Sequence, residues 1–342
     1  MLGILIAALV AGIITALVTP SVRRWVEARG VVDEPGERRE NKETKPRAGG
    51  IAIYLGFVIA VIVAVTIRQF ARDGQHTWSM QVVGILLATT FAAVTGLVDD
   101  FKDLSAVKQV IAILGAGLIL VAFNVRIEGV SNLLGMGQSG KYVASQHWHA
   151  LNNITSILAT LIWVFVVTKT VDAIDGLDGL ASGVCAISAT ALALMAVQMA
   201  RPEFATLAVI AAALAGSCLG FLRHNAYPSK IIMGTIGAWT LGVPLAAVSI
   251  LGAFKVAAAV SFVVPILVLG VPIFDYIHVV ARRLLDHAPL TSADRRHLHH
   301  RLMDRWGHDQ RKVVYFIYGV AIVFCVVALC VFQFTRVPHR LN

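Results

Sequence analysis

Two groups of aspartates carry the strongest chemical signal in this sequence. The first is Asp99-Asp100-Phe101-Lys102-Asp103, and the second is the segment 172–180, in which an aspartate recurs at every third position. Both groups adjoin long apolar segments, where a carboxylate is costly because lipid solvates it poorly. Like charges three or four positions apart on a helix also repel one another, so a cation partner is expected. Because Mg²⁺ is held by one or two carboxylates together with substrate phosphates, the pattern favours a metal–phosphate site.

The simpler interpretation of each group is a solvated turn between helices. The first group would then be a helix end paired with nearby lysines, and for a single pair of acids that explanation would suffice. In the second group Gly176 and Gly179, which each cost about 1 kcal/mol inside a helix, indicate a broken turn or a close backbone approach. A flexible turn explains these glycines but not the repeated acids. Lys169 precedes Asp172 by about one helical turn, so we expect the two side chains to pair.

Two further polar segments lie between apolar stretches. Segment 223–230 contains Asn225, whose amide both donates and accepts hydrogen bonds, as recognition of a base or a sugar requires. A capped loop before a helix explains that segment equally well. Segment 294–302 combines histidines with arginines; it has no thiolate or matched acid to complete a zinc site, and it suits the diphosphate of a substrate better. Its candidate binding residues are His297, His299, His300 and Arg301.

Apolar stretches dominate the rest of the chain and must position these segments. Of the 342 residues, 57% are hydrophobic and 14% are charged, whereas about a quarter of the residues in a soluble domain are charged. Helices of about 20 apolar residues are the spanning form that such a pattern allows. We expect an all-α, polytopic helical membrane protein with about 10 (10–11) transmembrane helices. It would form a single integral-membrane domain over residues 1–342. The expected spans are 2–20, 50–67, 80–98, 106–123, 152–171, 180–199, 204–222, 236–253, 257–276 and 313–334.

Arginine and lysine concentrate in two loops, 21–47 and 282–312, on the same side of these spans. The positive-inside rule places both loops in the cytoplasm and both termini outside. The acidic groups then fall on the cytoplasmic face as well. This bias explains the net charge of +9 better than binding to nucleic acid, so no nucleic-acid partner is expected. A transporter would place polar groups near mid-span, whereas these spans are nearly free of charge.

Taken together, these residues resemble the motifs of the polyprenyl-phosphate N-acetylhexosamine-1-phosphate transferases, and the resemblance covers nearly the whole chain. The motifs that carry it are Asp33-Glu34-Pro35, Pro46-Arg47-Ala48-Gly49-Gly50, Gly96-Leu97-Val98-Asp99-Asp100, Asp175-Gly176-Leu177-Asp178-Gly179, Asn225 with Pro228, Met233-Gly234, Phe274-Asp275 and His297-Leu298-His299-His300. The last of these looks more like the GlcNAc-1-phosphate transferases, because the muramoyl-pentapeptide branch tends to carry three consecutive histidines there.

The resemblance implies a transferase of cell-envelope glycan synthesis, embedded in the plasma membrane with a cytoplasmic active site. In such enzymes a polyprenyl phosphate attacks the β-phosphorus of a UDP-amino-sugar and releases UMP. The resemblance also implies Mg²⁺, with Mn²⁺ as a substitute, as the cofactor that neutralises the diphosphate. A homodimer is the assembly that the family suggests.

The resemblance also assigns candidate roles to individual residues. Asp99 or Asp100 would deprotonate or orient the lipid phosphate. The candidate catalytic residues are Asp99, Asp100, Asp175 and Asp178. The candidate metal ligands are Asp100, Asp172 and Asp175. The candidate substrate-binding residues are Arg47, Lys108, Asn225, Lys230, His297, His299, His300 and Arg301.

The sequence departs from the family pattern at a position that matters for the metal. Where the family usually reads Met-Gly-Asp-x-Gly-Ser, this chain has Thr235 in place of the aspartate. A hydroxyl is a much weaker Mg²⁺ ligand than a carboxylate. Asp172 stands where the family has an asparagine, and it restores the number of carboxylates. The main alternative is a non-catalytic homologue that binds nucleotide-sugar or lipid phosphate. A prenyl-transferring membrane enzyme is a weaker alternative, because it would not need Asn225 or the histidines.

Overall fold

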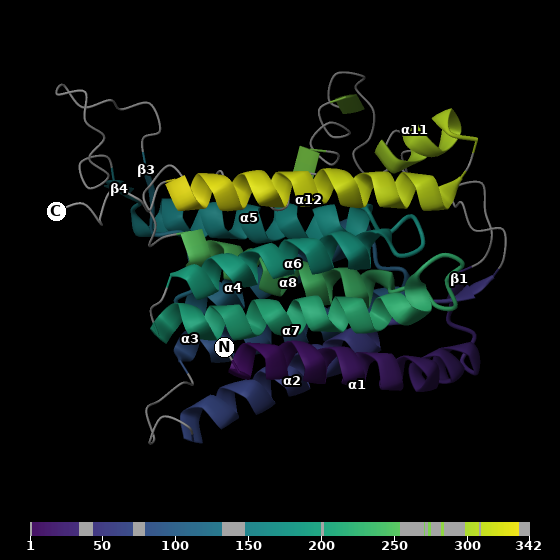
Figure 1. The fold of residues 1–342 in the computed structure, drawn as a ribbon, viewed down its shortest axis with the longest axis horizontal. Helices are drawn as coiled ribbons and strands as arrows, with labels where there is room; N and C mark the ends of the chain where they lie inside the picture. The colour runs from purple at the N-terminus through teal and green to yellow at the C-terminus, as the bar shows by residue number, and fades with distance from the viewer. Residues whose placement is uncertain are drawn as a thin grey trace.

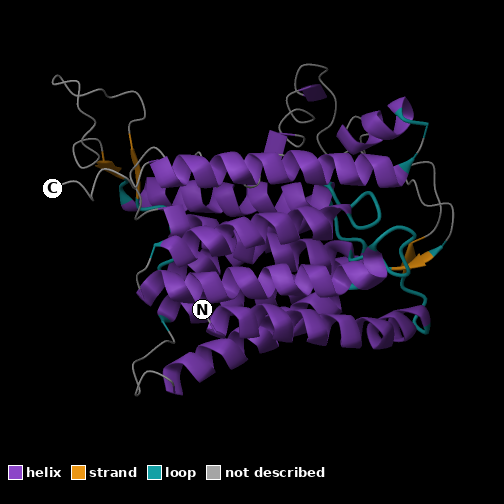
Figure 2. Cartoon of the chain, viewed as in Figure 1, coloured by secondary structure: helices purple, strands orange, loops and turns teal. Residues whose placement is uncertain are grey.

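A computed structural model describes residues 2–33, 44–70, 79–131, 148–199, 202–253, 270, 273–274, 282–283, 298–307 and 309–334. Over these residues the chain forms a bundle of long helices that lie side by side, with two short sheets in the connecting loops (Figure 1, Figure 2). The all-α class expected from the composition is confirmed.

The helices have the following bounds: α1 (Leu2–Glu27), α2 (Gly50–Phe70), α3 (Met80–Lys102), α4 (Ala106–Ala122), α5 (Asn153–Ala173), α6 (Leu180–Gln198), α7 (Pro202–Asn225), α8 (Gly234–Ala253), α11 (Leu298–Arg305) and α12 (Gln310–Phe334). The strands are β1 (Val32–Asp33) with β2 (Lys45–Pro46), and β3 (Gly129–Ser131) with β4 (Trp148–Ala150). Both pairs are antiparallel.

Eight of the described helices are long and apolar enough to cross a membrane, and each contains one of the expected spans or falls one residue short of it. The expected span 106–123 corresponds to α4, which has 17 residues and is slightly shorter than the roughly 20 that a perpendicular span needs. The expected span 257–276 lies almost wholly outside the described residues. The sequence therefore predicted these helices with small errors at their ends.

Helix α8 occupies the centre of the bundle. It packs against α2, α3, α5 and α7, and nearly all of its span is buried. The start of α8 lies against the start of α2 at backbone distance, since a Cβ added to Gly50 would fall 2.1 Å from the backbone nitrogen of Gly237. Only a residue without a side chain allows this approach. The first turn of α8 is thereby fixed relative to the polar residues around it.

The polar loops gather at one end of the bundle. The first residues of α1 and the last residues of α12 lie toward one end, and β1 and α11 lie at the opposite end (Figure 1). The ends of α3, α5 and α7 and the beginnings of α6 and α8 belong to the same end as β1, because their loops contact one another there. We call this the polar end of the bundle. All the described aspartates of the two acidic groups lie at it.

Candidate active site

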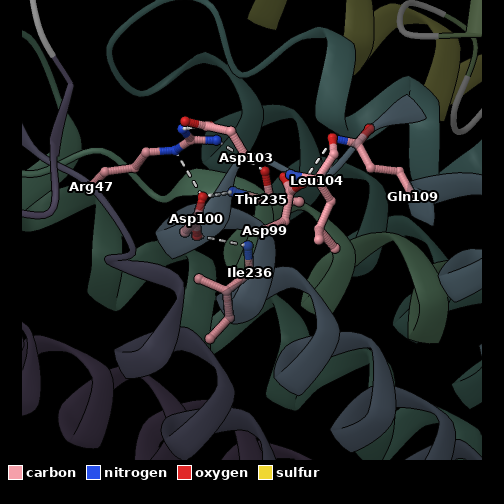
Figure 3. Close-up of polar contacts among 8 residues, drawn as sticks. All are labelled: Arg47, Asp99, Asp100, Asp103, Leu104, Gln109, Thr235 and Ile236. Atoms are coloured by element: carbon pink, nitrogen blue, oxygen red, sulfur yellow. Dashed lines mark hydrogen bonds and ion pairs between the residues drawn. The ribbon is translucent and has the colours of Figure 1, made fainter. Parts of the chain in front are cut away.

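Asp100 caps helix α8 from a neighbouring helix. It lies in the last turn of α3, and its two carboxylate oxygens accept hydrogen bonds from the backbone N–H groups of Thr235 (2.8 Å) and Ile236 (3.1 Å), as Figure 3 shows. The first N–H groups of a helix have no partner within the helix, and the helix dipole favours a negative charge there. Asp100 is 7% exposed, so the α8 N-terminus and the carboxylate stabilise each other in a dry environment.

Gly234 makes this cap possible. Its φ of 71° lies in the left-handed region, which a glycine occupies without strain. A Cβ at this position would meet the carboxylate of Asp100 at 2.6 to 2.9 Å. The sequence motif around Gly234 therefore has a direct physical meaning, because it lets a carboxylate approach the start of α8.

Arg47 completes the charge balance around Asp100. Its Nε lies 2.8 Å from Asp100 Oδ1, and its terminal nitrogens contact Asp103 (3.3 Å) and the Thr235 hydroxyl (3.2 Å). Burial works against a charged guanidinium, but the surrounding carboxylates, Asp100 foremost, raise the pKa of Arg47 above its ordinary value. The side chain of Asp103 is 89% exposed, so its ion pair with Arg47 contributes little. The Arg47 guanidinium is therefore held firmly by Asp100, whereas another anion can replace Asp103 as its second carboxylate partner.

The segment that carries Arg47 is held by backbone hydrogen bonds to the loop before α8. Ile232 N–H donates to the Pro46 carbonyl at 2.9 Å, and Gly49 and Gly50 N–H donate to the Ile232 and Met233 carbonyls. These bonds explain why the motif at 46–50 and the motif at 233–237 act together although they are far apart in the chain. These backbone hydrogen bonds therefore fix the position of the segment that carries Arg47.

Asp99 begins a hydrogen-bonded chain that links three helices. Its Oδ1 accepts from the Leu104 N–H at 3.0 Å and from the Gln109 amide at 2.9 Å (Figure 3). The Gln109 carbonyl oxygen in turn accepts from Lys169 at 3.2 Å, and Lys169 pairs with Asp172. The pairing of Lys169 with Asp172 was predicted from spacing and is confirmed. Gln109 was missed, and its only signal in the sequence is its place one turn inside α4.

Helix α3 ends earlier than the Asp99–Asp103 spacing suggested. The helix stops at Lys102, and Asp103 adopts a left-handed conformation with φ of 44°. Its N–H closes the helix by donating to the Asp99 carbonyl at 2.8 Å. Aspartate tolerates this conformation better than most residues. As a result Asp99 is buried, whereas Asp103 points to solvent.

Asp175 is a partly buried carboxylate next to other acids. Burial and the negative charges of Asp172 and Asp100 raise the pKa of Asp175 well above its ordinary value, although Arg47 and the Gly234 N–H act in the opposite direction. A carboxylate in such surroundings is destabilised when ionised and gains from a cation. Among the described aspartates of the two acidic groups, Asp175 is therefore one whose environment favours a metal ion or a proton.

Asp178 is fully engaged by the protein itself. Its oxygens accept from the Lys45 ammonium (2.7 and 3.0 Å), the Ser229 N–H (2.9 Å) and the Ser229 hydroxyl (2.7 Å). The side chain of Asp178 is 2% exposed. These bonds tie β2 to the turn before α6 and to the loop after α7. We interpret Asp178 as a residue that positions Asp175 three residues away rather than one that reaches substrate.

Asn225 is likewise used within the protein. Its amide donates to the Ile231 carbonyl at 3.0 Å and accepts from the Ser182 hydroxyl at 2.9 Å. The alternative of a structurally capped loop is thus the one that these contacts favour. Lys108 and Lys230 are exposed at the polar end, where their charges are free to face an anion in solution. His297 lies outside the described residues, and α11 includes the backbone of His299, His300 and Arg301.

The donor set fits a magnesium ion that is completed by substrate. Among the described residues no three His, Cys, Asp or Glu side chains are grouped closely enough to hold a metal by themselves. Asp100 is occupied by Arg47 and the α8 N-terminus, and Asp178 by Lys45 and Ser229. Asp175 remains, and Asp172, which pairs with Lys169, lies three residues before it. Mg²⁺ is commonly bound by one or two carboxylates with substrate phosphates and water filling the other positions.

The fold and the site define a helical membrane protein that gathers paired carboxylates and a fixed arginine at one end of its bundle, as enzymes of phosphoryl transfer do. Comparison with known proteins gives the family. Residues 82–253 match the model for glycosyl transferase family 4, and curated relatives match over nearly the full chain. The chain belongs to glycosyl transferase family 4, so the resemblance drawn from its motifs is confirmed.

Individual relatives refine this assignment. The chain is 32% identical to a probable undecaprenyl-phosphate N-acetylglucosaminyl 1-phosphate transferase of Bacillus subtilis, over 96% of this chain and 85% of the relative. It is 34% identical to the decaprenyl-phosphate N-acetylglucosaminephosphotransferase of Mycobacterium tuberculosis, over 91% and 78%. It is 26% identical to a phospho-N-acetylmuramoyl-pentapeptide-transferase of Caldicellulosiruptor bescii, over 97% of both chains. The higher identities lie with the N-acetylglucosamine branch, as the histidine motif suggested.

Proposed function

We propose that this protein transfers a sugar 1-phosphate, N-acetylglucosamine 1-phosphate or a close relative, from a UDP-sugar to a polyprenyl phosphate at the cytoplasmic face of the plasma membrane. The observation that carries the proposal is the cluster of Asp172, Asp175, Asp100 and Arg47 at the polar end, in a chain whose relatives are named for this reaction. The reaction serves cell-envelope glycan synthesis.

In this reaction an oxygen of the lipid phosphate forms a bond to the β-phosphorus of the UDP-sugar. The bond from that phosphorus to the bridging oxygen breaks, and UMP leaves with the electron pair. Both reactants are anions, so catalysis depends on positioning and on positive charge. Mg²⁺, held by Asp172 and Asp175 with substrate oxygens, would neutralise the diphosphate and the leaving UMP.

The residues of this chain have distinct tasks in that scheme. Arg47 receives the lipid phosphate, because an incoming phosphate can replace the exposed Asp103 as the partner of its terminal nitrogens. Asp100 holds Arg47 in place and fixes the start of α8. Asp99, held by Gln109, lies beside Asp100 and orients the acceptor or takes its proton. Lys108 and Lys230 add positive charge at the mouth of the site.

A transfer assay with purified protein tests the proposal. Radiolabelled UDP-sugars of several kinds are supplied with undecaprenyl phosphate, with Mg²⁺ or with EDTA, and both lipid product and UMP are measured. Asp175→Asn should lower kcat by roughly a hundredfold or more, as loss of a key electrostatic group does. Glu27→Gln is the matched control, because Glu27 pairs with Arg23 on the surface of α1 and such pairs contribute little. Binding of nucleotide-sugar without release of UMP would instead support the non-catalytic alternative.

Thr235→Asp tests whether the site has lost its catalytic activity through the threonine at this position. An aspartate at 235 would compete with Asp100 for Arg47, so we expect this variant to lose activity rather than gain it. An inactive parent protein together with an active Thr235→Asp variant would refute the proposed activity.

A further inference from the structure

Asp172 is held differently from the other acids of the polar end. Asp100 and Asp178 each accept a hydrogen bond from at least one backbone N–H group and also pair with a cation. The Asp172 carboxylate pairs with Lys169, and among the described residues no second cation lies within ion-pair distance of it. The side chains of Lys169 and Asp172 are 22% and 23% exposed, so water reaches the pair. The protein partner of Asp172 is therefore easier to exchange than those of Asp100 and Asp178.

The position of Asp172 makes its negative charge costly. It lies in the last turn of α5, where the helix dipole disfavours an anion. Its charge also helps to raise the pKa of Asp175, because two neighbouring carboxylates repel each other. Lys169, about one turn earlier on the same helix, supplies a compensating positive charge. If Lys169 were removed, the Asp172 carboxylate would gain from any other cation that could reach it.

Gln109 holds the Lys169 ammonium from the other side. The amide nitrogen of Gln109 donates to Asp99 at 2.9 Å (Figure 3), and this orients its carbonyl oxygen toward Lys169, which donates to it at 3.2 Å. An ammonium carries three donors on a flexible stem. Lys169 can therefore release Asp172, keep its hydrogen bond to Gln109 and remain at the polar end.

Asp172 thus has two candidate cations. One is the Lys169 ammonium, and the other is the Mg²⁺ that Asp172 and Asp175 would hold together with substrate oxygens. Both cations are attracted by the same carboxylate, and at such short range they repel each other. Each must therefore weaken the binding of the other.

From this competition we propose that Lys169 acts through Asp172 to control metal binding: it neutralises Asp172 while no metal is bound, and it keeps only Gln109 of the two partners when Asp172 coordinates the ion. This rests on the proposed function and adds to it a residue that sets the affinity for the metal. Because the displacement of Lys169 costs part of the binding free energy, the protein alone binds a divalent ion weakly. Lys169 thereby makes the metal site depend on the oxygens that the nucleotide sugar supplies.

Mn²⁺ binding to the purified protein in detergent tests this without turnover, through the electron paramagnetic resonance signal of the free ion. Lys169→Gln removes the competing charge, and Lys169→Arg keeps it. Lys102→Gln is the matched control, because Lys102 is an exposed lysine at the end of α3. This control removes one positive charge from the polar end and leaves the Lys169–Asp172 pair intact.

We expect Lys169→Gln to lower the Kd for Mn²⁺ roughly tenfold, because the ion no longer competes with an ammonium. Lys169→Arg should stay close to the parent, and so should Lys102→Gln, since salt screens an exposed charge. Adding Asp172→Asn to Lys169→Gln should abolish the gain. A Kd that is unchanged or higher in Lys169→Gln, or one that falls equally in Lys102→Gln, would overturn the proposal.

A second measurement uses the parent protein and needs no substitution. Its lysines are acetylated briefly, without Mn²⁺ and with enough Mn²⁺ to fill the site, and the modified peptides are quantified by mass spectrometry. A lysine side chain reacts more readily once it has left its carboxylate partner. Labelling of Lys169 should therefore rise with Mn²⁺, while that of Lys102 and of the exposed Lys312 stays constant. Equal labelling of Lys169 in both conditions would contradict the proposed displacement.

The transfer assay separates this inference from the proposed function. A parent protein that transfers sugar phosphate, but whose affinity for Mn²⁺ does not depend on Lys169, would overturn the inference alone. A parent protein that shows the Lys169-dependent Mn²⁺ binding and transfers no sugar phosphate would refute the proposed function alone.

Discussion

Replacing Gly234 by alanine tests whether the Asp100 cap organises the site. The added Cβ would lie 2.6 Å from one carboxylate oxygen of Asp100 and 2.8 Å from the other. The left-handed conformation itself costs a non-glycine residue about 1–2 kcal/mol. Moving the carboxylate also weakens two hydrogen bonds to a charged acceptor, each worth about 1.5–3 kcal/mol. We therefore expect Gly234→Ala to lose about 2–4 kcal/mol of stability.

Two other glycines separate these contributions. Gly30 has a φ of 67° and no atom within 4 Å of an added Cβ, so Gly30→Ala reports the backbone strain alone. Gly252 lies in the last turns of α8, also without a neighbour within 4 Å. Because alanine favours a helix by about 1 kcal/mol over glycine, Gly252→Ala should be neutral or stabilising. Each of the three variants differs from the parent protein by one added methyl group.

The assay is thermal unfolding of the purified proteins in detergent, followed by circular dichroism, together with the transfer reaction. The apparent melting temperature should fall in Gly30→Ala and fall further in Gly234→Ala, and it should hold or rise in Gly252→Ala. Gly234→Ala should also lose most of its transfer activity, because a displaced Asp100 carboxylate would no longer hold the Arg47 guanidinium in position. If Gly234→Ala melts no lower than Gly30→Ala, the contact with Asp100 does not stabilise α8 and the reasoning fails.

Three further substitutions test separate parts of the site. Gln109→Leu removes the amide that holds Asp99, and kcat should fall roughly tenfold with KM for the nucleotide sugar unchanged; an unchanged kcat would contradict this. Asp172→Asn removes a proposed Mg²⁺ ligand, so kcat should fall, and it also removes a negative charge that raises the pKa of Asp175, so the acid limb of the remaining pH–rate profile at saturating Mg²⁺ should move to lower pH; an upward shift would show the sign to be wrong. Asp178→Asn breaks a buried ion pair and should cost roughly 3 kcal/mol of stability, which would lower the melting temperature in detergent. A melting temperature equal to that of the parent would contradict the positioning role given to Asp178.

The sequence predicted the helices and their common end well, because both follow from local patterns. Apolar runs of about 20 residues define spans without reference to the rest of the fold. Loop charge then predicts which ends lie together. The pairing of Lys169 with Asp172 was equally accessible, since the two residues are three positions apart on one helix.

The partners of the other acids could not be predicted, because they come from distant segments. Asp100 and Thr235 are separated by 135 positions, and Lys45 and Asp178 by 133. Spacing along one helix suggested nearby lysines as partners for the first acidic group, and the structure gives Asp100 an arginine from the loop before α2 instead. The packing of α2, α3 and α8 brings Arg47, Asp100 and Thr235 together.

Thr235 illustrates how the fold changes the meaning of a substitution. The contact of this position with Asp100 is made by its backbone N–H, which any residue except proline supplies. Its hydroxyl accepts a hydrogen bond from Arg47 at 3.2 Å, so the side chain supports the same guanidinium that Asp100 binds. Compared with the family pattern that the motifs resemble, the carboxylate absent at 235 would be offset by Asp172, which pairs with Lys169. We infer that Thr235 leaves Arg47 paired with Asp100 and able to accept an incoming phosphate, whereas an aspartate at 235 would compete for the guanidinium.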